Sequence, residues 1–423
     1  MSTTEGVRSD APSYPFIPPA PLEPPTEFAE LRDREPISRI EYAGGPAWLL
    51  TRYDDIRAAM TDSRLVPYLP GMPEGEEAND SGVLFLMSGP RHTRLRRLVT
   101  GALSARRVAA LRPAVARLAA ARLADLVASG PPVDLMAAYA APLAIGTLSE
   151  LMGVDIADRD GFVEWSSAIT ALFGESPSQD LMRSGQKLGA FITQLVASKR
   201  AAPGPDLISG LIEAEDRDGH PLTDAEVNGV AFSVLGAGYV PPAQALTLGM
   251  LRLLLDPAVA TMLRTDPSMV PRTVDELLRL DPSGAGSADR ALRATDDVEI
   301  GGGHIRAGDI VVAPLGAANR DPAVFPAPER FDPTRSENPH VSFAPGIHHC
   351  VGAALARMEL EVAITTLLVG LPELTLAADV EELAWRTGTV GERNLVALPV
   401  TWRASMPRPE AVSHHPGPGT SWR

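Results

Sequence analysis

The residues with the clearest chemical potential in this sequence surround its single cysteine, Cys350. Residues 343–352 read Phe-Ala-Pro-Gly-Ile-His-His-Cys-Val-Gly and deliver the cysteine to an apolar helix predicted over residues 352–369. A helix N-terminus carries partial positive charge and unpaired N–H groups, which favour the thiolate, the form of cysteine that binds a metal. Gly346 and Gly352 permit tight turns and the close approach of a flat macrocycle. By itself, a lone cysteine is more often a buried structural residue than a ligand.

Two predicted helices each carry a polar pair on one face. Glu276 and Arg279 are three residues apart and can form a bidentate ion pair, although such a pair is usually a solvated surface salt bridge. His92 and Arg96 are four residues apart at the start of a helix after Pro90, which suits them to bind an anion together. The alternative for this second pair is an ordinary basic helix face, because further arginines lie nearby.

The composition describes an acidic globular protein. Its 423 residues, 45% of them hydrophobic, can form one large or two ordinary domains with a substantial core. The net charge of −15 repels phosphate backbones, which argues against a nucleic-acid partner. One cysteine excludes an internal disulfide and a Cys-rich zinc site. We find no run of about 18 uncharged apolar residues and no signal peptide, so we expect a cytoplasmic protein without a membrane partner.

The elements that must position these residues are mainly helices. Helical patterning dominates residues 90–281, and Thr223 and Glu226 form a capping box that predicts a long central helix over residues 223–256. Residues 294–314 alternate as short strands do, whereas residues 319–345 suggest an irregular packed segment.

The chain is expected to form one domain with two extensions. These are a Pro-rich extended arm on the surface at residues 1–25 and a disordered tail at residues 404–423, which leave the domain at residues 26–403. Inside the domain we further predict a strand at residues 46–52, a short helix at residues 54–61 and a mobile loop at residues 66–83.

The stretch around Cys350 resembles the signature of the cytochrome P450 family, in which a phenylalanine, a glycine, a histidine, the cysteine and a second glycine stand at fixed offsets. The matching residues are Phe343, Gly346, His348, Cys350 and Gly352, followed by Leu355, Arg357 and Glu359. Ala344 and Pro345 depart from the common bacterial form, but neither position supplies the ligand. The resemblance extends over roughly residues 15–403.

This resemblance implies a mainly α fold with small β-sheets, a triangular, prism-like single domain with haem b between the central long helix and the helix after Cys350. It implies a monooxygenase-type oxidoreductase whose haem iron is ligated by Cys350. Ferredoxin and ferredoxin reductase would supply electrons, the substrate would be a small molecule, and we expect a monomer.

The resemblance also assigns roles to the polar pairs. Glu276 and Arg279 would join Arg330 in a structural ion-pair network, and His92 with Arg96 would bind one haem propionate, with His348 as a further contact.

The arginine for the other propionate is displaced in this chain. The family pattern places it at Leu292, which lies between Arg290 and Arg293. Side chains alternate along a strand, so Arg290 shares the face of Leu292 and is our predicted ligand.

The central helix departs from the family at its middle. Most P450s carry Ala-Gly-x-acid-Thr there, and the acid and threonine help to deliver protons during the reaction with dioxygen. The corresponding candidate catalytic residues here are Ala237, Gly238, Tyr239, Val240 and Pro241, followed by Pro242. The prolines have no N–H to donate to the carbonyls of Ala237 and Gly238, so the helix should stay kinked while the hydroxyl and the carboxylate are lost.

Several functions are compatible with this departure. The first is a P450 of bacterial specialised metabolism that abstracts hydrogen and closes rings or couples aromatic or cyclic-peptide-like substrates. The second is an ordinary monooxygenase whose substrate assists proton delivery, or a hydroxylase weakened by neutral drift. The third is a peroxygenase, although fatty-acid peroxygenases place arginine before the proline, where this chain has Val240. A non-enzymatic haem sensor or carrier is the fourth, which the family architecture disfavours.

Overall fold

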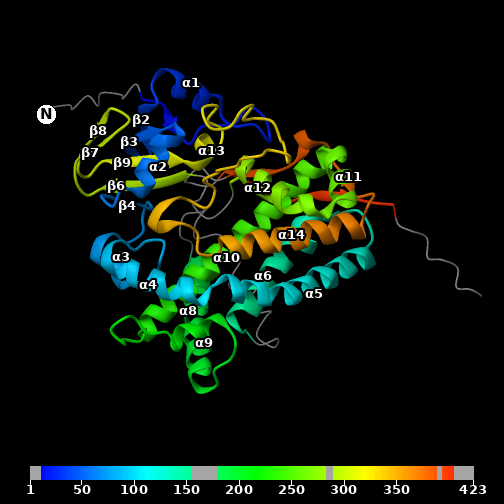
Figure 1. Ribbon diagram of the computed structural model, residues 1–423, viewed down its shortest axis with the longest axis horizontal. Coiled ribbons are helices and arrows are strands. Elements are labelled where there is room, and N and C mark those ends of the chain that lie inside the picture. Colours follow the sequence, from blue (N-terminus) through cyan, green and yellow to red (C-terminus); the bar gives the residue numbers. More distant parts are fainter. Residues whose placement is uncertain (1–10, 155–178, 283–288, 388–392, 404–423) are drawn as a thin grey trace, which may run out of the picture.

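The computed structural model describes residues 11–154, 179–282, 289–387 and 393–403. It has a roughly triangular outline in Figure 1, with the strands of the largest sheet gathered at one corner and helices filling the rest. This mainly helical molecule with small sheets confirms the predicted fold class.

The largest sheet combines segments that are far apart in the sequence. Its order is β1 (Ser13–Tyr14), β2 (Ile37–Tyr42), β3 (Gly45–Leu50), β9 (Ile310–Pro314), β6 (Asp289–Ala294) and β4 (Leu65–Pro67). The smaller sheets pair β10 (Thr375–Leu376), β13 (Pro399–Thr401) and β5 (Val133–Asp134), then β11 (Trp385–Thr387) with β12 (Arg393–Leu395), and β7 (Val298–Ile300) with β8 (Gly303–Ile305). The predicted strands at residues 46–52 and 294–314 are thereby confirmed.

The predicted surface arm is in part built into this sheet. β1 pairs in parallel with β2, and Tyr14 and Phe16 are buried. The ring centroids of Phe16 and Phe28 lie 5.8 Å apart. Aromatic side chains bury large apolar areas, which explains why Tyr14 and Phe16 anchor this segment to the core, while the other described residues of the arm are at least partly exposed.

Residues 66–83 were predicted to form a mobile loop, but they contain regular secondary structure. They include most of β4 and the short helix α3 (Gly75–Asp80), in which Ala78 is buried. The polar composition suggested a loop, but the pairing of β4 with β6 gives this segment a partner that no local pattern shows.

Helices form the larger part of the molecule. They are α1 (Thr26–Arg34), α2 (Tyr53–Thr61), α4 (Gly89–Ala102), α5 (Ala105–Ser129), α6 (Ala141–Met152), α8 (Gln179–Ala201), α9 (Leu207–Ile212), α10 (Asp224–Leu255), α11 (Pro257–Thr265), α12 (Val270–Leu280), α13 (Leu315–Ala318) and α14 (Ala353–Gly370). Short π and 3₁₀ turns are η1 (Met136–Ala140), η3 (Pro267–Met269), η4 (Gly346–His348) and η5 (Val380–Glu382). Residues 319–345 contain neither helix nor strand, as predicted.

The long central helix α10 begins at the predicted capping box. The Glu226 N–H donates to Thr223 Oγ1 (3.2 Å), and the Thr223 N–H donates to Glu226 Oε2 (2.9 Å). The helix has 32 residues and passes through Pro241 and Pro242 without a break. Buried residues occur on all its sides, which is the pattern of a helix inside a large core.

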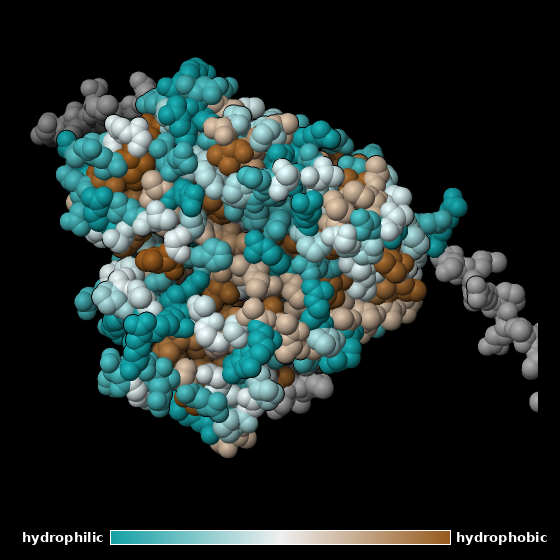
Figure 2. Space-filling model, viewed as in Figure 1, coloured by the Kyte–Doolittle hydropathy of each residue, from teal (hydrophilic) through white to brown (hydrophobic). Residues whose placement is uncertain are grey.

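Apolar residues collect in two clusters. The larger surrounds α10 together with α5, α6 and α14, and the smaller lies between the six-stranded sheet, α2 and α13. Figure 2 shows mainly hydrophilic residues on this face, with apolar residues in small separate patches. Among the described residues no single helix is long and apolar enough to cross a membrane, and α10 with α11 passes that test only as a pair bent by 104°.

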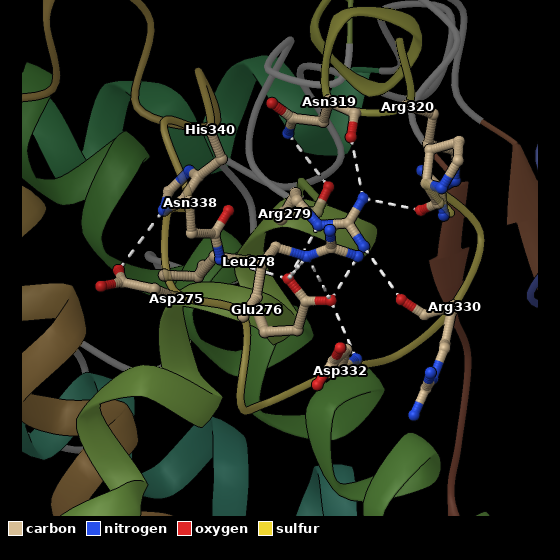
Figure 3. A network of polar contacts seen from close by, with 12 residues as sticks. Asp275, Glu276, Leu278, Arg279, Asn319, Arg320, Arg330, Asp332, Asn338 and His340 are labelled. Atoms are coloured by element: carbon tan, nitrogen blue, oxygen red, sulfur yellow. Dashed lines mark hydrogen bonds and ion pairs between the residues drawn. The ribbon is translucent and has the colours of Figure 1, made fainter. Parts of the chain in front are cut away.

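A buried ion pair joins α12 to the irregular segment at residues 319–345. Arg279 donates to both carboxylate oxygens of Glu276 at 2.8 and 2.9 Å, and both side chains are almost inaccessible to water. The guanidinium also donates to the carbonyl of Asn319, as Figure 3 shows, and to the carbonyl of Pro328. The predicted Glu276–Arg279 pair therefore lies in the core and not on the surface.

The third member of this network differs from the prediction. Arg330 contributes its backbone carbonyl, which accepts from Arg279 at 3.1 Å, while its side chain points away from Glu276 in Figure 3. The guanidinium that approaches Glu276 belongs to Arg335, with Nε 3.4 Å from Oε2. The chain follows an irregular path between residues 330 and 335, and the position that the family resemblance indicated, Arg330, contributes its backbone while Arg335 contributes the side chain.

Replacing Arg335 should therefore matter more than replacing Arg330. Arg335→Ala leaves buried carboxylate charge poorly compensated and should lower the free energy of unfolding by about 1–3 kcal/mol. Arg330→Ala keeps the backbone carbonyl and should change it by less than about 0.5 kcal/mol. Chemical denaturation of the two variants, with retained haem measured in parallel, checks this order. A larger loss in Arg330→Ala would restore the original assignment.

Candidate functional site

Cys350 lies at the end of a tight loop directly before α14. The Cys350 N–H donates to the carbonyl of Phe343 at 2.7 Å, which closes the loop. Gly346 has a φ of +79°, and a Cβ there would lie 2.6 Å from the carbonyl oxygen of Met60, so glycine is required both by conformation and by space. Ala344 has a φ of +55°, a conformation that costs a non-glycine residue about 1–2 kcal/mol. Gly346 thus shapes the loop against α2 and does not line the cavity described next.

One cavity extends from Cys350 to α10. Its walls come from the cysteine loop, α14, α10, α4, α6, β6 and the segments around residues 67–69 and 84–86. The predicted cofactor residues that line it are Phe343, His348, Cys350, Gly352, His92, Arg96 and Arg290. The structure therefore brings together, around a single space, seven of the eight residues predicted to bind the cofactor.

Two neutral histidines and an arginine form one side of this cavity. The ring centroids of His92 and His348 lie 4.4 Å apart. Burial lowers the pKa of His92 to about 4 and that of His348 to about 3, so both rings are uncharged at neutral pH. His92 Nδ1 is buried without a hydrogen-bond partner, and Arg96 donates to the carbonyl of His349. The pair His92 and Arg96 thus faces the cavity and not a basic outer surface.

Arg290 and Arg293 have opposite orientations on β6. Arg290 lines the cavity together with Leu292, and its buried Nε has no hydrogen-bond partner. Arg293 instead forms an ion pair with Glu74 (Nε–Oε2 2.5 Å) and lies 4.6 Å from the ring centroid of Tyr68. Burial lowers the pKa of Arg290, and Cys350 opposes that shift. The orientation follows the predicted strand alternation, and the contact of Arg290 with a propionate stays a prediction.

The middle of α10 supplies only part of the predicted catalytic segment to the cavity. Ala237, Gly238 and Pro241 line it, as does Pro242. Tyr239 packs against the larger apolar cluster, and neither it nor Val240 is among the described lining residues. No side-chain hydroxyl or carboxylate of residues 237–242 therefore faces this space.

Opposing effects act on the Cys350 thiol. Burial raises its pKa, while the Gly352 N–H and the guanidinium groups of Arg290, Arg96 and Arg357 oppose that rise. The helix N-terminus favours the thiolate as predicted, but burial is the larger effect. A metal cation is what would shift the balance to the thiolate.

The residues present fit the haem that the resemblance implies. The cavity offers a thiol for the iron, and the unpartnered buried nitrogens of Arg290 and His92 can pair with the propionate carboxylates. Without such anions, buried polar nitrogens of this kind would be costly.

Among the polar side chains on the cavity wall that were not predicted as site residues are Thr147 and Glu359. Thr147 lies on α6, and Glu359 lies on α14. Glu359 follows the lining residues Leu355 and Ala356 by one helical turn, so helical spacing places it on the same face of α14. The sequence shows this helical spacing, but it does not show how deeply Glu359 is buried in the core.

Comparison with known proteins identifies a matching family model, similar sequences and similar structures. The family model described as Cytochrome P450 matches residues 166–370. Nocardicin C N-oxygenase of Nocardia uniformis subsp. tsuyamanensis is 37% identical over 401 residues, 93% of this chain and 100% of the relative. Mycinamicin IV hydroxylase/epoxidase of Micromonospora griseorubida is 37% identical over 395 residues, 92% of this chain and 98% of the relative. The solved structure of CYP105P1 in complex with filipin I has a TM-score of 0.86 at 36% identity and covers 94% of this chain and 100% of that one.

The role of Cys350 can be tested by spectroscopy. In the reduced, CO-bound protein we expect the Soret band characteristic of a thiolate ligand. Cys350→His should move this band to the region of imidazole-ligated haem. An unchanged band would end the assignment, because the chain has no other cysteine to replace it.

The two arginines of β6 provide a matched pair for haem retention. Each charge-assisted hydrogen bond contributes about 1.5–3 kcal/mol, so Arg290→Ala should raise the haem dissociation constant about tenfold or more. Arg293→Ala removes only a partly exposed ion pair and should leave it nearly unchanged. The measurement is the transfer of haem to apomyoglobin, and equal losses in the two variants would contradict the assignment.

Proposed function

This chain belongs to the cytochrome P450 family, and from that premise we propose that it is a monooxygenase of bacterial specialised metabolism that oxidises a largely apolar small molecule above Cys350. It is a P450 oxidoreductase with haem as its cofactor, and bacterial P450s take their electrons from ferredoxin and ferredoxin reductase. The monomeric state and the cytoplasmic location are part of this proposal.

The observation that carries the proposal is the character of the cavity wall beyond the cysteine loop. Most of the side chains there are apolar, among them Phe85, Leu86, Leu148, Leu151, Val234 and Leu292. Such a wall suits a substrate that is bound by burial of apolar surface and oriented by few polar contacts. The relatives are named as an N-oxygenase of nocardicin C and a hydroxylase/epoxidase of mycinamicin IV, which are oxygen-inserting activities.

The residues of this chain would have the following roles. Bound haem supplies the activation of dioxygen for attack on the substrate. Cys350 would hold its iron, and Arg290 with His92 and Arg96 would hold its carboxylates. The prolines at positions 241 and 242 deprive the carbonyls of Ala237 and Gly238 of their usual helical donors. We propose that these carbonyls accept a hydrogen bond from a substrate O–H or N–H, which then orders water as the missing threonine hydroxyl would.

A second candidate is oxidation without oxygen transfer, such as ring closure or oxidative coupling of an aromatic or cyclic-peptide-like substrate. The specific observation in its favour is that α10 presents no side-chain proton donor to the cavity at residues 237–242. Turnover under labelled dioxygen with candidate macrolides, diketopiperazines and indoles, followed by mass spectrometry, separates the two. Incorporation of label supports the monooxygenase, whereas a product that has only lost hydrogen supports the second candidate.

Restoring the family pair should not improve this enzyme on its native substrate. Val240→Glu with Pro241→Thr reintroduces a donor but also returns an N–H to the carbonyl of Ala237, which would then be lost as a substrate contact. We expect product formed per reduced nicotinamide to stay equal or fall, and substrates without a polar hydrogen to be strongly uncoupled in the wild type. Faster and better coupled turnover of the double variant would show that the missing pair is a defect.

A further inference from the structure

Three arginines place positive charge near the Cys350 thiol, and one of them finds its counter-charge within the protein. The guanidinium groups of Arg290, Arg96 and Arg357 all act on this thiol. Arg290 and Arg96 line the cavity, where the carboxylates of haem would offset their charges. Arg357 lies on α14 and is not among the described residues of the cavity wall. Its charge therefore has to be balanced by another side chain of the protein.

Asp275 of α12 provides this balance. Arg357 Nε donates to Asp275 Oδ1 at 2.7 Å. The central carbon of the Arg357 guanidinium also lies 4.5 Å from the ring centroid of Phe343, which is a cation–π contact. Phe343 lines the cavity, and its backbone carbonyl accepts from the Cys350 N–H. The guanidinium thus contacts both a carboxylate on α12 and the aromatic ring at the start of the cysteine loop.

His340 holds the same carboxylate from a second direction. Its Nδ1 accepts from the Ser342 N–H at 3.3 Å, so Nε2 carries the hydrogen that it donates to Asp275 Oδ1, also at 3.3 Å. Figure 3 shows the imidazole ring turned toward the Asp275 carboxylate. Burial acts to raise the pKa of Asp275, but the hydrogen bonds from His340 and Arg357 outweigh it and lower that pKa, so the carboxylate is ionised at neutral pH.

A partly exposed ion pair of this kind usually contributes little to stability. The chain offers a comparable pair in Arg112 and Glu361, which joins α5 to α14. The pair of Asp275 and Arg357 differs from it in one respect, because its cation rests on Phe343 and acts on the Cys350 thiol. Charges placed around a metal ligand change the reduction potential of the metal even where they add nothing to stability.

We propose that Asp275 is a positioning residue that sets the reduction potential of the bound haem, by holding the Arg357 charge against Phe343 and partly offsetting it. Reduction adds one electron, supplied by ferredoxin, to the iron that Cys350 would hold, so the charge of haem and thiolate together falls by one unit. A nearby cation favours this change, and a nearby anion opposes it. The proposal rests on haem as the cofactor and is independent of the substrate and of the reaction.

The two charges can be removed one at a time. Titration of the haem-loaded, substrate-free protein with dithionite and a reference dye gives the ratio of ferrous to ferric haem at a fixed solution potential. Arg357→Gln should lower this ratio about threefold or more. Asp275→Asn keeps an amide oxygen that can accept from Arg357 and His340 but loses the negative charge, so it should raise the ratio about as much. Arg357→Lys retains the positive charge and should lie closer to wild type than Arg357→Gln.

Controls separate this role from a structural one. Glu361→Gln removes the anion of the comparable pair, which is not among the described groups that act on the Cys350 thiol, and it should leave the ratio unchanged. The CO-bound Soret band of each variant should stay at the thiolate position, which shows that a changed ratio does not come from loss of the ligand.

The sign of the two shifts decides the question. Shifts of Arg357→Gln and Asp275→Asn in the same direction, or no shift in either, would overturn the proposal. If Asp275→Asn does not retain haem, equal ratios in Arg357→Gln and Arg357→Lys would overturn it instead. The titration needs neither substrate nor turnover, so a native product without oxygen label would end the proposed monooxygenase function and leave this result unaffected.

Discussion

Arg279 and Glu276 carry their charges where almost no water reaches them, and the position of the cysteine loop depends on this pair. Such a pair is stable only when its remaining donors and acceptors are used, because desolvation otherwise outweighs the attraction. Arg279 therefore holds the carbonyl of Asn319, and the Asn319 side chain bonds to the Val341 N–H and the Ser342 hydroxyl. Ser342 is the residue directly before Phe343, where the loop to Cys350 begins. The ion pair thus fixes, through a chain of hydrogen bonds, the start of the loop that carries the ligand.

Inside the cavity, by contrast, several buried polar groups lack the partners that Glu276 and Arg279 have. Arg290 and His92 are buried with unpartnered nitrogens, and Glu359 is buried without a cation. The first two suit an anionic cofactor, which would complete their hydrogen bonds on binding. Glu359 has no such complement and resolves the cost of burial by keeping its proton. Buried polar groups without protein partners are therefore concentrated around the cavity in which the reaction would occur.

Local sequence patterns gave correct predictions for features that a single helix or strand determines. The capping box of Thr223 and Glu226 predicted the start of α10, and strand alternation correctly oriented Arg290 toward the cavity and Arg293 away from it. Patterns failed where the chain is irregular, since no period relates Arg330 and Arg335 to Glu276 across residues 319–345. They also could not show that Tyr14 and Phe16 pack into the core, because the partner strand lies more than 20 residues later. For Glu359 the spacing was visible, but the depth that sets its pKa is a property of the packed helices.

The existence of two apolar clusters has a consequence for how the molecule unfolds. Apolar contact is short-ranged, so each cluster stabilises mainly the elements that surround it. The helical cluster contains α12, while the sheet cluster includes Val341 and Ala344 next to the cysteine loop. The hydrogen bonds between Arg279, Asn319 and Ser342 run from one to the other, and they are directional and few. These polar contacts therefore add to the coupling between the two clusters, and a chain that loses them is expected to unfold in a less cooperative transition.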